Sequence, residues 1–134
     1  MEPIFVDTTV WVDWFKGINS PQTSRLAAYL TQNYPIWIAP VILQEILQGI
    51  RDDRQHELAK TSLLALNLFL FEPYAMATEA AQLYRTLRKQ GITIRKANDC
   101  LIAQYALKAG MMLLHNDSDF DLIASGTPLK TSRF

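Results

Sequence analysis

Short apolar runs alternate with longer amphipathic stretches along this chain. The runs are continuous rather than alternating, which is typical of strands buried on both faces of a sheet. They predict strands at residues 4–6, 36–38, 68–71 and 111–114, and a weaker final strand at 128–131. The stretches between them have helical periodicity, with starts and ends marked by Thr, Pro and Gly. They predict helices near residues 8–15, 24–32, 40–50, 53–66, 75–90, 97–109 and 120–124.

Strands that alternate with helices indicate an α/β fold, with a parallel sheet flanked by helices on both faces. The length of 134 residues suits one domain, so we treat residues 1–134 as a single unit. Hydrophobic residues make up 49% and charged residues 19%, a balance typical of a globular protein.

The composition also bears on compartment and partners. The single cysteine, Cys100, excludes an internal disulfide and suits a reducing compartment. The start of the chain lacks the features of a signal peptide, and the longest apolar stretch is too short to span a bilayer. We therefore expect a cytoplasmic protein with no membrane association. The formal net charge is zero, from 13 basic and 13 acidic side chains, so nucleic-acid binding would need a local patch.

Four acidic residues fall where the predicted topology brings strand ends together. Asp7 follows the first strand, and Glu45 lies in the early turns of the helix after the second. Asp99 lies in the first turn of the helix that leads to the fourth strand, and Asp117 comes just after that strand. In parallel sheets, the helices begin at the carboxyl edge, where ligands bind. We expect these four carboxylates at one rim, although Glu72 also follows a strand there and position alone is not selective.

A group of carboxylates needs a cation. Two unit charges about 4 Å apart repel by roughly 4 kcal/mol at an effective dielectric near 20. Helical spacing puts Glu45 and Asp99 at the borders of apolar faces, where an unpaired charge is costly. Oxygen ligands without matching His or Cys favour Mg²⁺, with Mn²⁺ as an alternative. Such a site suits metal-assisted cleavage of phosphodiesters, with one ion or two.

Four segments also resemble, in order and spacing, the motifs of PIN-domain ribonucleases. The resemblance covers nearly the whole chain and is strongest to the VapC toxins of bacterial and archaeal toxin–antitoxin pairs. The segments are residues 6–11 (VDTTVW), 44–49 (QEILQG), 97–103 (ANDCLIA) and 115–121 (HNDSDFD). The resemblance implies a sheet ordered 3-2-1-4-5 and Mg²⁺-dependent endoribonuclease activity on a structured RNA such as tRNA. It also implies a homodimer and a cognate antitoxin that occupies the groove.

The resemblance assigns roles to individual residues. Asp7, Glu45, Asp99 and Asp117 match the family's acidic positions, with Asp7, Asp99 and Asp117 as metal ligands. Glu45 would complete the cluster or position the attacking water. Thr9 matches a hydroxyl residue that supports the site, and Asn116 is a further supporting residue. Asp119 also suits the fourth acidic position; Asp117, nearer the strand, is favoured, and Asp119 is assigned to helix capping.

Other residues and functions remain open at this stage. Arg95 and Lys96 lead into the helix that carries Asp99, so we expect them to contact RNA phosphates. The alternative to an enzyme is a non-catalytic PIN-fold module that binds RNA or protein. A phosphatase with Asp7 as nucleophile is disfavoured, because such enzymes need a second acid two residues later and this chain has Thr9.

Overall fold

A five-stranded parallel sheet forms the centre of the protein. The computed structural model describes residues 1–132, and all neighbouring strands of its sheet pair in parallel. The strand order is β3-β2-β1-β4-β5, so the predicted order is confirmed. The strands are Ile4–Val6 (β1), Ile36–Ile38 (β2), Asn67–Leu68 (β3), Met112–Leu114 (β4) and Thr131–Ser132 (β5).

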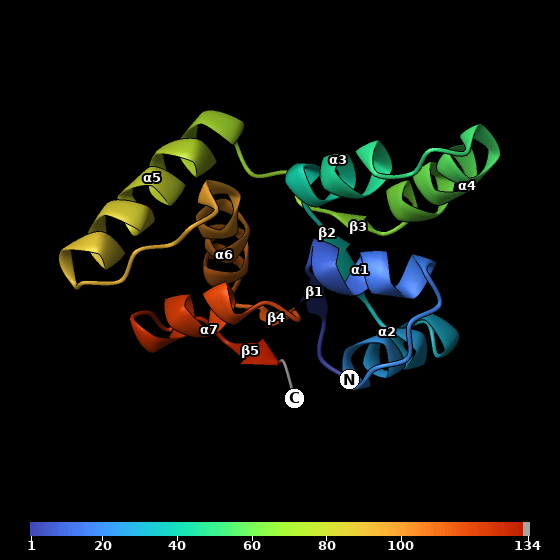
Figure 1. The fold of residues 1–134 in the computed structure, drawn as a ribbon, viewed down its shortest axis with the longest axis horizontal. Helices are drawn as coiled ribbons and strands as arrows, with labels where there is room; N and C mark the ends of the chain where they lie inside the picture. The colour runs from blue at the N-terminus through green and yellow to red at the C-terminus, as the bar shows by residue number, and fades with distance from the viewer. Residues whose placement is uncertain (133–134) are drawn as a thin grey trace.

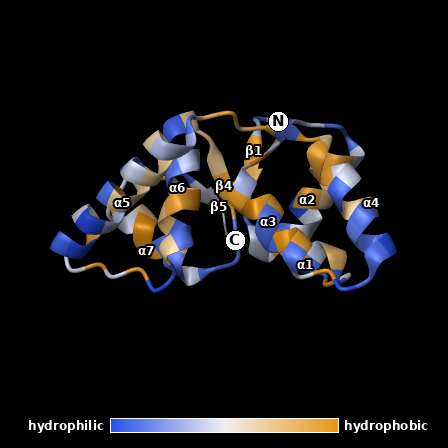
Figure 2. Ribbon diagram, turned by 90° about the horizontal axis from the view of Figure 1, so that it is seen from above, coloured by the Kyte–Doolittle hydropathy of each residue, from blue (hydrophilic) through white to orange (hydrophobic). Residues whose placement is uncertain are grey.

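The helices form two groups on opposite sides of the sheet (Figure 1). The chain moves from β1 to β3 in one direction and then returns through β4 to β5, so right-handed crossovers put α1–α4 on one face and α5–α7 on the other. Figure 2 shows strands between the two groups. Among the described helices, none is both long and apolar enough to cross a bilayer. Their bounds are Thr8–Phe15 (α1), Pro21–Thr31 (α2), Pro40–Gln48 (α3), Asp53–Leu64 (α4), Pro73–Lys89 (α5), Ala97–Ala109 (α6) and Ser118–Ser125 (α7).

The central strand β1 shows why its sequence is a continuous apolar run. It pairs with β2 on one side and β4 on the other, and its three residues are at most 2% exposed. Phe5 packs edge-on against the ring of Phe69, with centroids 5.2 Å apart. A strand covered on both faces has no solvent side, so every position favours an apolar residue. This buried strand ends at Val6, and the next residue, Asp7, lies at the carboxyl edge of the sheet.

Two strand predictions were wrong in position. The third strand is Asn67–Leu68 rather than residues 68–71, because Phe69 turns its ring into the core while Leu70 is 89% exposed. The final strand is Thr131–Ser132 rather than residues 128–131. Its pairing begins at Lys130, whose carbonyl accepts the N–H of Leu113. Both β3 and β5 are edge strands, which pair with only one neighbour, so fewer hydrogen bonds determine where each strand begins and ends.

Three helices begin earlier than their apolar periodicity predicts. Ser20 forms a capping box with Thr23, which starts α2 at Pro21 rather than at residue 24. The Glu72 carboxylate accepts the N–H groups of Tyr74 and Ala75, which starts α5 at Pro73 rather than at residue 75. Glu72, the extra acid on the rim, is thus a helix cap. In the third case, Asp117 caps α7 and starts it at residue 118 rather than 120.

Candidate metal centre

The ends of β1 and β4 meet at the carboxyl edge of the sheet. The N–H of Asp7 donates to the carbonyl of Leu114 over 2.9 Å, so the first residue after β1 is joined to the last residue of β4. Asp7 is 2% exposed and caps α1. Three residues beyond Leu114, Asp117 caps α7. The topology therefore brings two acids distant in sequence to one place, as predicted.

Asp7 is held by the first turn of α1. Its Oδ2 accepts the backbone N–H of Thr9 over 3.1 Å and the Thr9 hydroxyl over 2.6 Å. Burial raises the pKa of Asp7 from 3.8 to about 6, while the hydrogen bonds from Thr9 lower it and the charge of Glu45 raises it. A carboxyl with this pKa is still mostly ionised at neutral pH, but it takes up a proton at a higher pH than an exposed aspartate does. A cation beside it would favour the ionised form.

Asp99 is the least satisfied acid of the site. It lies in the first turn of α6, is 6% exposed, and has a buried Oδ2 with no hydrogen-bond partner among the described residues. Burial, followed by the charges of Asp117 and Asp7, raises its pKa from 3.8 to about 7. The charge of Lys96 opposes this rise. A buried carboxylate oxygen without a donor is a strong indication of a missing positive partner.

Asp117 is the best-satisfied acid of the site. Its Oδ1 accepts the N–H of Asp119 over 3.0 Å, and its Oδ2 accepts from Lys96 Nζ over 3.0 Å. Burial raises the pKa of Asp117, but these two hydrogen bonds and the charges of Lys96 and Arg95 outweigh it and hold the pKa below its ordinary value. Asp117 is therefore ionised at neutral pH.

The role assigned to Asp119 from sequence was wrong. Asp117, not Asp119, caps α7, because Asp117 has the extended backbone of a cap residue (φ −139°, ψ 124°). Asp119 lies inside the helix, is 2% exposed, and has a buried Oδ2 with no partner among the described residues. Its Oδ1 accepts from Arg95 Nη2 over 3.4 Å. Asp119 is thus part of the acidic site rather than only an element of helix structure.

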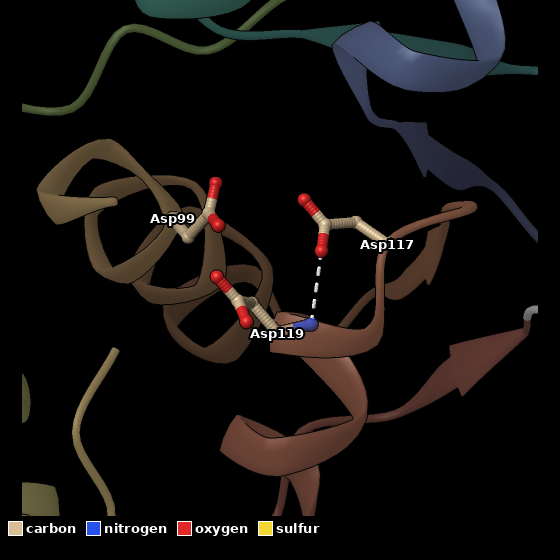
Figure 3. A group of neighbouring side chains, drawn as sticks. All are labelled: Asp99, Asp117 and Asp119. Atoms are coloured by element: carbon tan, nitrogen blue, oxygen red, sulfur yellow. Dashed lines mark hydrogen bonds between the residues drawn. The ribbon is translucent and has the colours of Figure 1, made fainter. Parts of the chain in front are cut away.

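Three of the acids form a compact trio (Figure 3). One carboxylate oxygen from each of Asp99, Asp117 and Asp119 lies within 4.8 Å of the other two. Asp7 is coupled to the trio through its charge, which raises the pKa of Asp99. Glu45 raises the pKa of Asp7 through its charge, and its Oε1 accepts the hydroxyl of Thr8 over 2.7 Å. Of the four predicted acids, Asp99 and Asp117 lie in the trio, while Asp7 is linked to it through its charge effect on Asp99 and Glu45 through its effect on Asp7. Asp119, which was assigned to helix capping from the sequence, is the third member of the trio.

The donor set fits a hard divalent cation. The trio offers only carboxylate oxygens, and two of these are buried without a donor among residues 1–132. Mg²⁺ and Mn²⁺ prefer such ligands. Two nearby residues of softer chemistry are engaged elsewhere. His115 Nδ1 accepts the N–H of Asp117, and the Cys100 thiol is buried in the core with its pKa raised by burial to about 11.

The supporting residues act in different ways. The Thr9 hydroxyl donates to Asp7 and accepts the backbone N–H of Asn116 over 3.2 Å. The contribution of Asn116 thus comes from its backbone, while its side chain is exposed. Arg95 and Lys96, which were expected to contact RNA, form ion pairs with Asp119 and Asp117. Sequence alone did not indicate these pairs, because the partners are more than 20 positions apart.

The sequence and the fold are similar to those of known proteins. Residues 4–126 match the family model described as PIN domain. Ribonuclease VapC11 of Mycobacterium tuberculosis and a VapC ribonuclease of Mycobacterium bovis are each 33% identical over 132 residues, 98% of both chains. The structure of VapBC2 from Rickettsia felis bound to a promoter DNA fragment aligns with a TM-score of 0.74 at 22% identity, and DNA-bound VapBC from Salmonella typhimurium aligns with 0.74 at 15%. Each structural match covers 98% of both chains, which shows a shared fold.

Proposed function

We propose that this chain, which belongs to the PIN domain family and within it to the VapC ribonucleases, is a divalent-metal-dependent endoribonuclease. The observation that carries the proposal is the trio of Asp99, Asp117 and Asp119, in which two buried oxygens lack a donor among the described residues. A structural ion-pair network would satisfy these oxygens internally. A metal site leaves them for the ion.

We assign the acids to two roles, metal binding and positioning of the attacking water, according to where they lie. Asp99, Asp117 and Asp119, with Asp7 beside them, hold the cation, and Mg²⁺ is the ion that we propose, with Mn²⁺ as a substitute. When bound, the ion makes water more acidic and offsets negative charge that develops on the phosphodiester. Glu45 lies outside the trio, half-buried, and its Thr8 contact orients the carboxylate. We assign Glu45 to positioning the attacking water.

The substrate and partners follow from the relatives. The curated relatives are ribonucleases, and several related structures are VapBC complexes. This supports RNA as the substrate. We propose in addition, from the family resemblance, that the RNA is a structured one such as tRNA and that the protein acts in the cytoplasm. The VapBC complexes also support a cognate antitoxin as partner. The homodimer remains a proposal that rests on the family resemblance. On α1, Trp14 and Phe15 are 37% and 43% exposed and supply an apolar surface for the antitoxin.

The activity can be tested by mapping new RNA ends after induction of the protein in cells. The wild type is compared with Asp99→Asn, and with Asp53→Asn as a matched control, because Asp53 is exposed in the first turn of α4. We expect distinct new ends with the wild type and with Asp53→Asn, and none with Asp99→Asn. The same ends with a folded Asp99→Asn protein would contradict the metal-site assignment. A wild type that binds RNA without cutting it would favour a non-catalytic module.

A further inference from the structure

Two adjacent cations extend from the loop before α6 to the acids at the start of α7. Lys96 Nζ lies 3.0 Å from Asp117 Oδ2, and Arg95 Nη2 lies 3.4 Å from Asp119 Oδ1. The acids are 9% and 2% exposed, whereas the Lys96 and Arg95 side chains are 61% and 74% exposed. Each pair thus joins a buried carboxylate to a cation that can move into solvent.

The loop that carries Lys96 is fixed to the body of the protein. Ile94 is 2% exposed, and Ile92 packs beside Gly126 at the end of α7. A Cβ at Gly126 would lie 3.1 Å from Ile92 Cδ1, so the glycine allows this close approach. Because the backbone on the N-terminal side of Lys96 is anchored, the side chain reaches Asp117 from a defined position.

The two pairs leave the acids unequally satisfied. Both oxygens of Asp117 have donors, Oδ1 from the N–H of Asp119 and Oδ2 from Lys96. Asp99 and Asp119, in contrast, each keep a buried Oδ2 with no partner among residues 1–132. The hydrogen bond to Asp117 Oδ1 caps α7, and it can persist when a metal ion binds to Oδ2. If Asp117 gives Oδ2 to a cation, the ammonium of Lys96 and the cation compete for the same oxygen, and their like charges repel.

We infer that Lys96 is an internal counter-ion that competes with the divalent cation for Asp117 and is displaced when the cation binds. This rests on the proposed metal-dependent function. In the metal-free protein, the ammonium offsets repulsion among the clustered carboxylates. Lysine is charged at neutral pH, so this cation is available to pair with Asp117. Once displaced, its flexible stem lets it contact a phosphate of the substrate.

The inference is tested by titrating Mn²⁺ into the purified protein by calorimetry without RNA. Lys96→Gln is compared with wild type and with Lys89→Gln, because Lys89 is an exposed cation at the end of α5 that contacts no acid of the trio. We expect Lys96→Gln to bind Mn²⁺ about fivefold more tightly, the size expected for one partly exposed ion pair. Lys89→Gln should stay within about twofold of wild type, since exposed charges are screened.

A second readout separates competition from a general charge effect. With EDTA, Lys96→Gln should melt at a lower temperature than wild type, because Asp117 loses its partner. Saturating Mn²⁺ should remove that difference, because the wild-type pair is then already broken. The inference would be overturned if Lys96→Gln bound Mn²⁺ no more tightly than wild type. It would also be overturned if Lys89→Gln tightened Mn²⁺ binding as much as Lys96→Gln. Either result would leave the metal site intact. Absence of Mn²⁺ binding by all three folded proteins would overturn both the inference and the proposed metal dependence.

Discussion

The Thr9 hydroxyl donates a 2.6 Å hydrogen bond to Asp7 Oδ2 and accepts the backbone N–H of Asn116. This one side chain therefore links the residue after β1 to the segment after β4. The link orients the Asp7 carboxylate at the place where the two parallel strands end. Residues that orient a metal ligand in this way affect metal affinity or activity strongly without touching the ion.

We expect Thr9→Val to reduce cleavage about tenfold or more while leaving the fold intact. Valine matches the shape of threonine but cannot donate to Asp7. Because the hydrogen bonds from Thr9 lower the pKa of Asp7, their partial loss should raise that pKa further above about 6. The acidic limb of the pH–rate profile should then move to higher pH. The measurement is kcat/KM against pH on one RNA substrate.

Thr9→Ser is the matched control, because serine keeps the hydroxyl and loses only a methyl group. It should retain most of the activity and the wild-type acidic limb. If Thr9→Val and Thr9→Ser lose the same activity, packing of the methyl group rather than the hydrogen bond explains the effect.

Asp117→Asn and Asp119→Asn should change the stability of the metal-free protein in opposite directions. Asn at 117 can still cap α7 but loses the ion pair with Lys96, at a cost of about 1 kcal/mol. Asn at 119 also loses an ion pair, but this one is longer, at 3.4 Å from the exposed Arg95. Because the substitution removes a buried charge that has one unpartnered oxygen, it should stabilise the protein. Urea unfolding with EDTA measures both changes. If Asp119→Asn destabilises the protein as much as Asp117→Asn, the buried charge of Asp119 is compensated in the metal-free protein and this explanation is wrong.

The sequence could place Asp7 and Asp117 at the same edge of the sheet because the topology determines where their strands end. Asp7 and Asp117 each follow a strand, and parallel strands joined through helices must end at one edge. The order of strands needed more than local pattern, since periodicity does not say which strands are neighbours. It came from the family resemblance and is confirmed by the structure.

The role of Asp119 could not be derived from the sequence. The segment 117–119 reads Asp-Ser-Asp, and either Asp can cap a helix that begins there. A shift of two residues in the helix start decides which carboxylate caps and which turns inward. Helix starts are poorly fixed by apolar periodicity, because capping hydrogen bonds, not packing, determine them. The ion pair between Lys96 and Asp117 could not be predicted either, because it depends on the conformation of the loop between α5 and α6.

Gly126→Ala should destabilise the protein by about 1 to 2 kcal/mol. A Cβ at this position would lie 2.9 Å from Leu87 Cδ2 and 3.1 Å from Ile92 Cδ1, and Leu87 is fully buried. The side chains between α7 and the end of α5 would have to shift. Gly49→Ala is the control, since its Cβ would meet nothing closer than 3.5 Å and its φ of −86° suits alanine. Equal stability of the two variants in urea unfolding would refute this packing explanation.

The metal-free protein should lose stability as the pH rises from about 4 to about 8. The folded pKa values of Asp7 and Asp99, about 6 and about 7, lie above the ordinary value of 3.8. A carboxyl with a raised folded pKa binds its proton more tightly in the folded state. Folding therefore becomes less favourable as the proton leaves, and the full cost is present above the folded pKa. Urea unfolding in EDTA across this pH range measures the slope.

Asp99→Asn isolates the contribution of the most strongly shifted group. Asparagine carries no charge at any pH, so the variant should be more stable than wild type at pH 8, by on the order of 2 kcal/mol. Near pH 4 the advantage should disappear, because the wild-type carboxyl is then protonated in the folded state. Asp53→Asn, at an exposed position, should follow the wild-type slope. Saturating Mg²⁺ should reduce the advantage of Asp99→Asn at pH 8, because the ion stabilises the ionised wild-type carboxylates. A constant difference between wild type and Asp99→Asn from pH 4 to 8 would mean that burial of this charge does not govern the stability of the site.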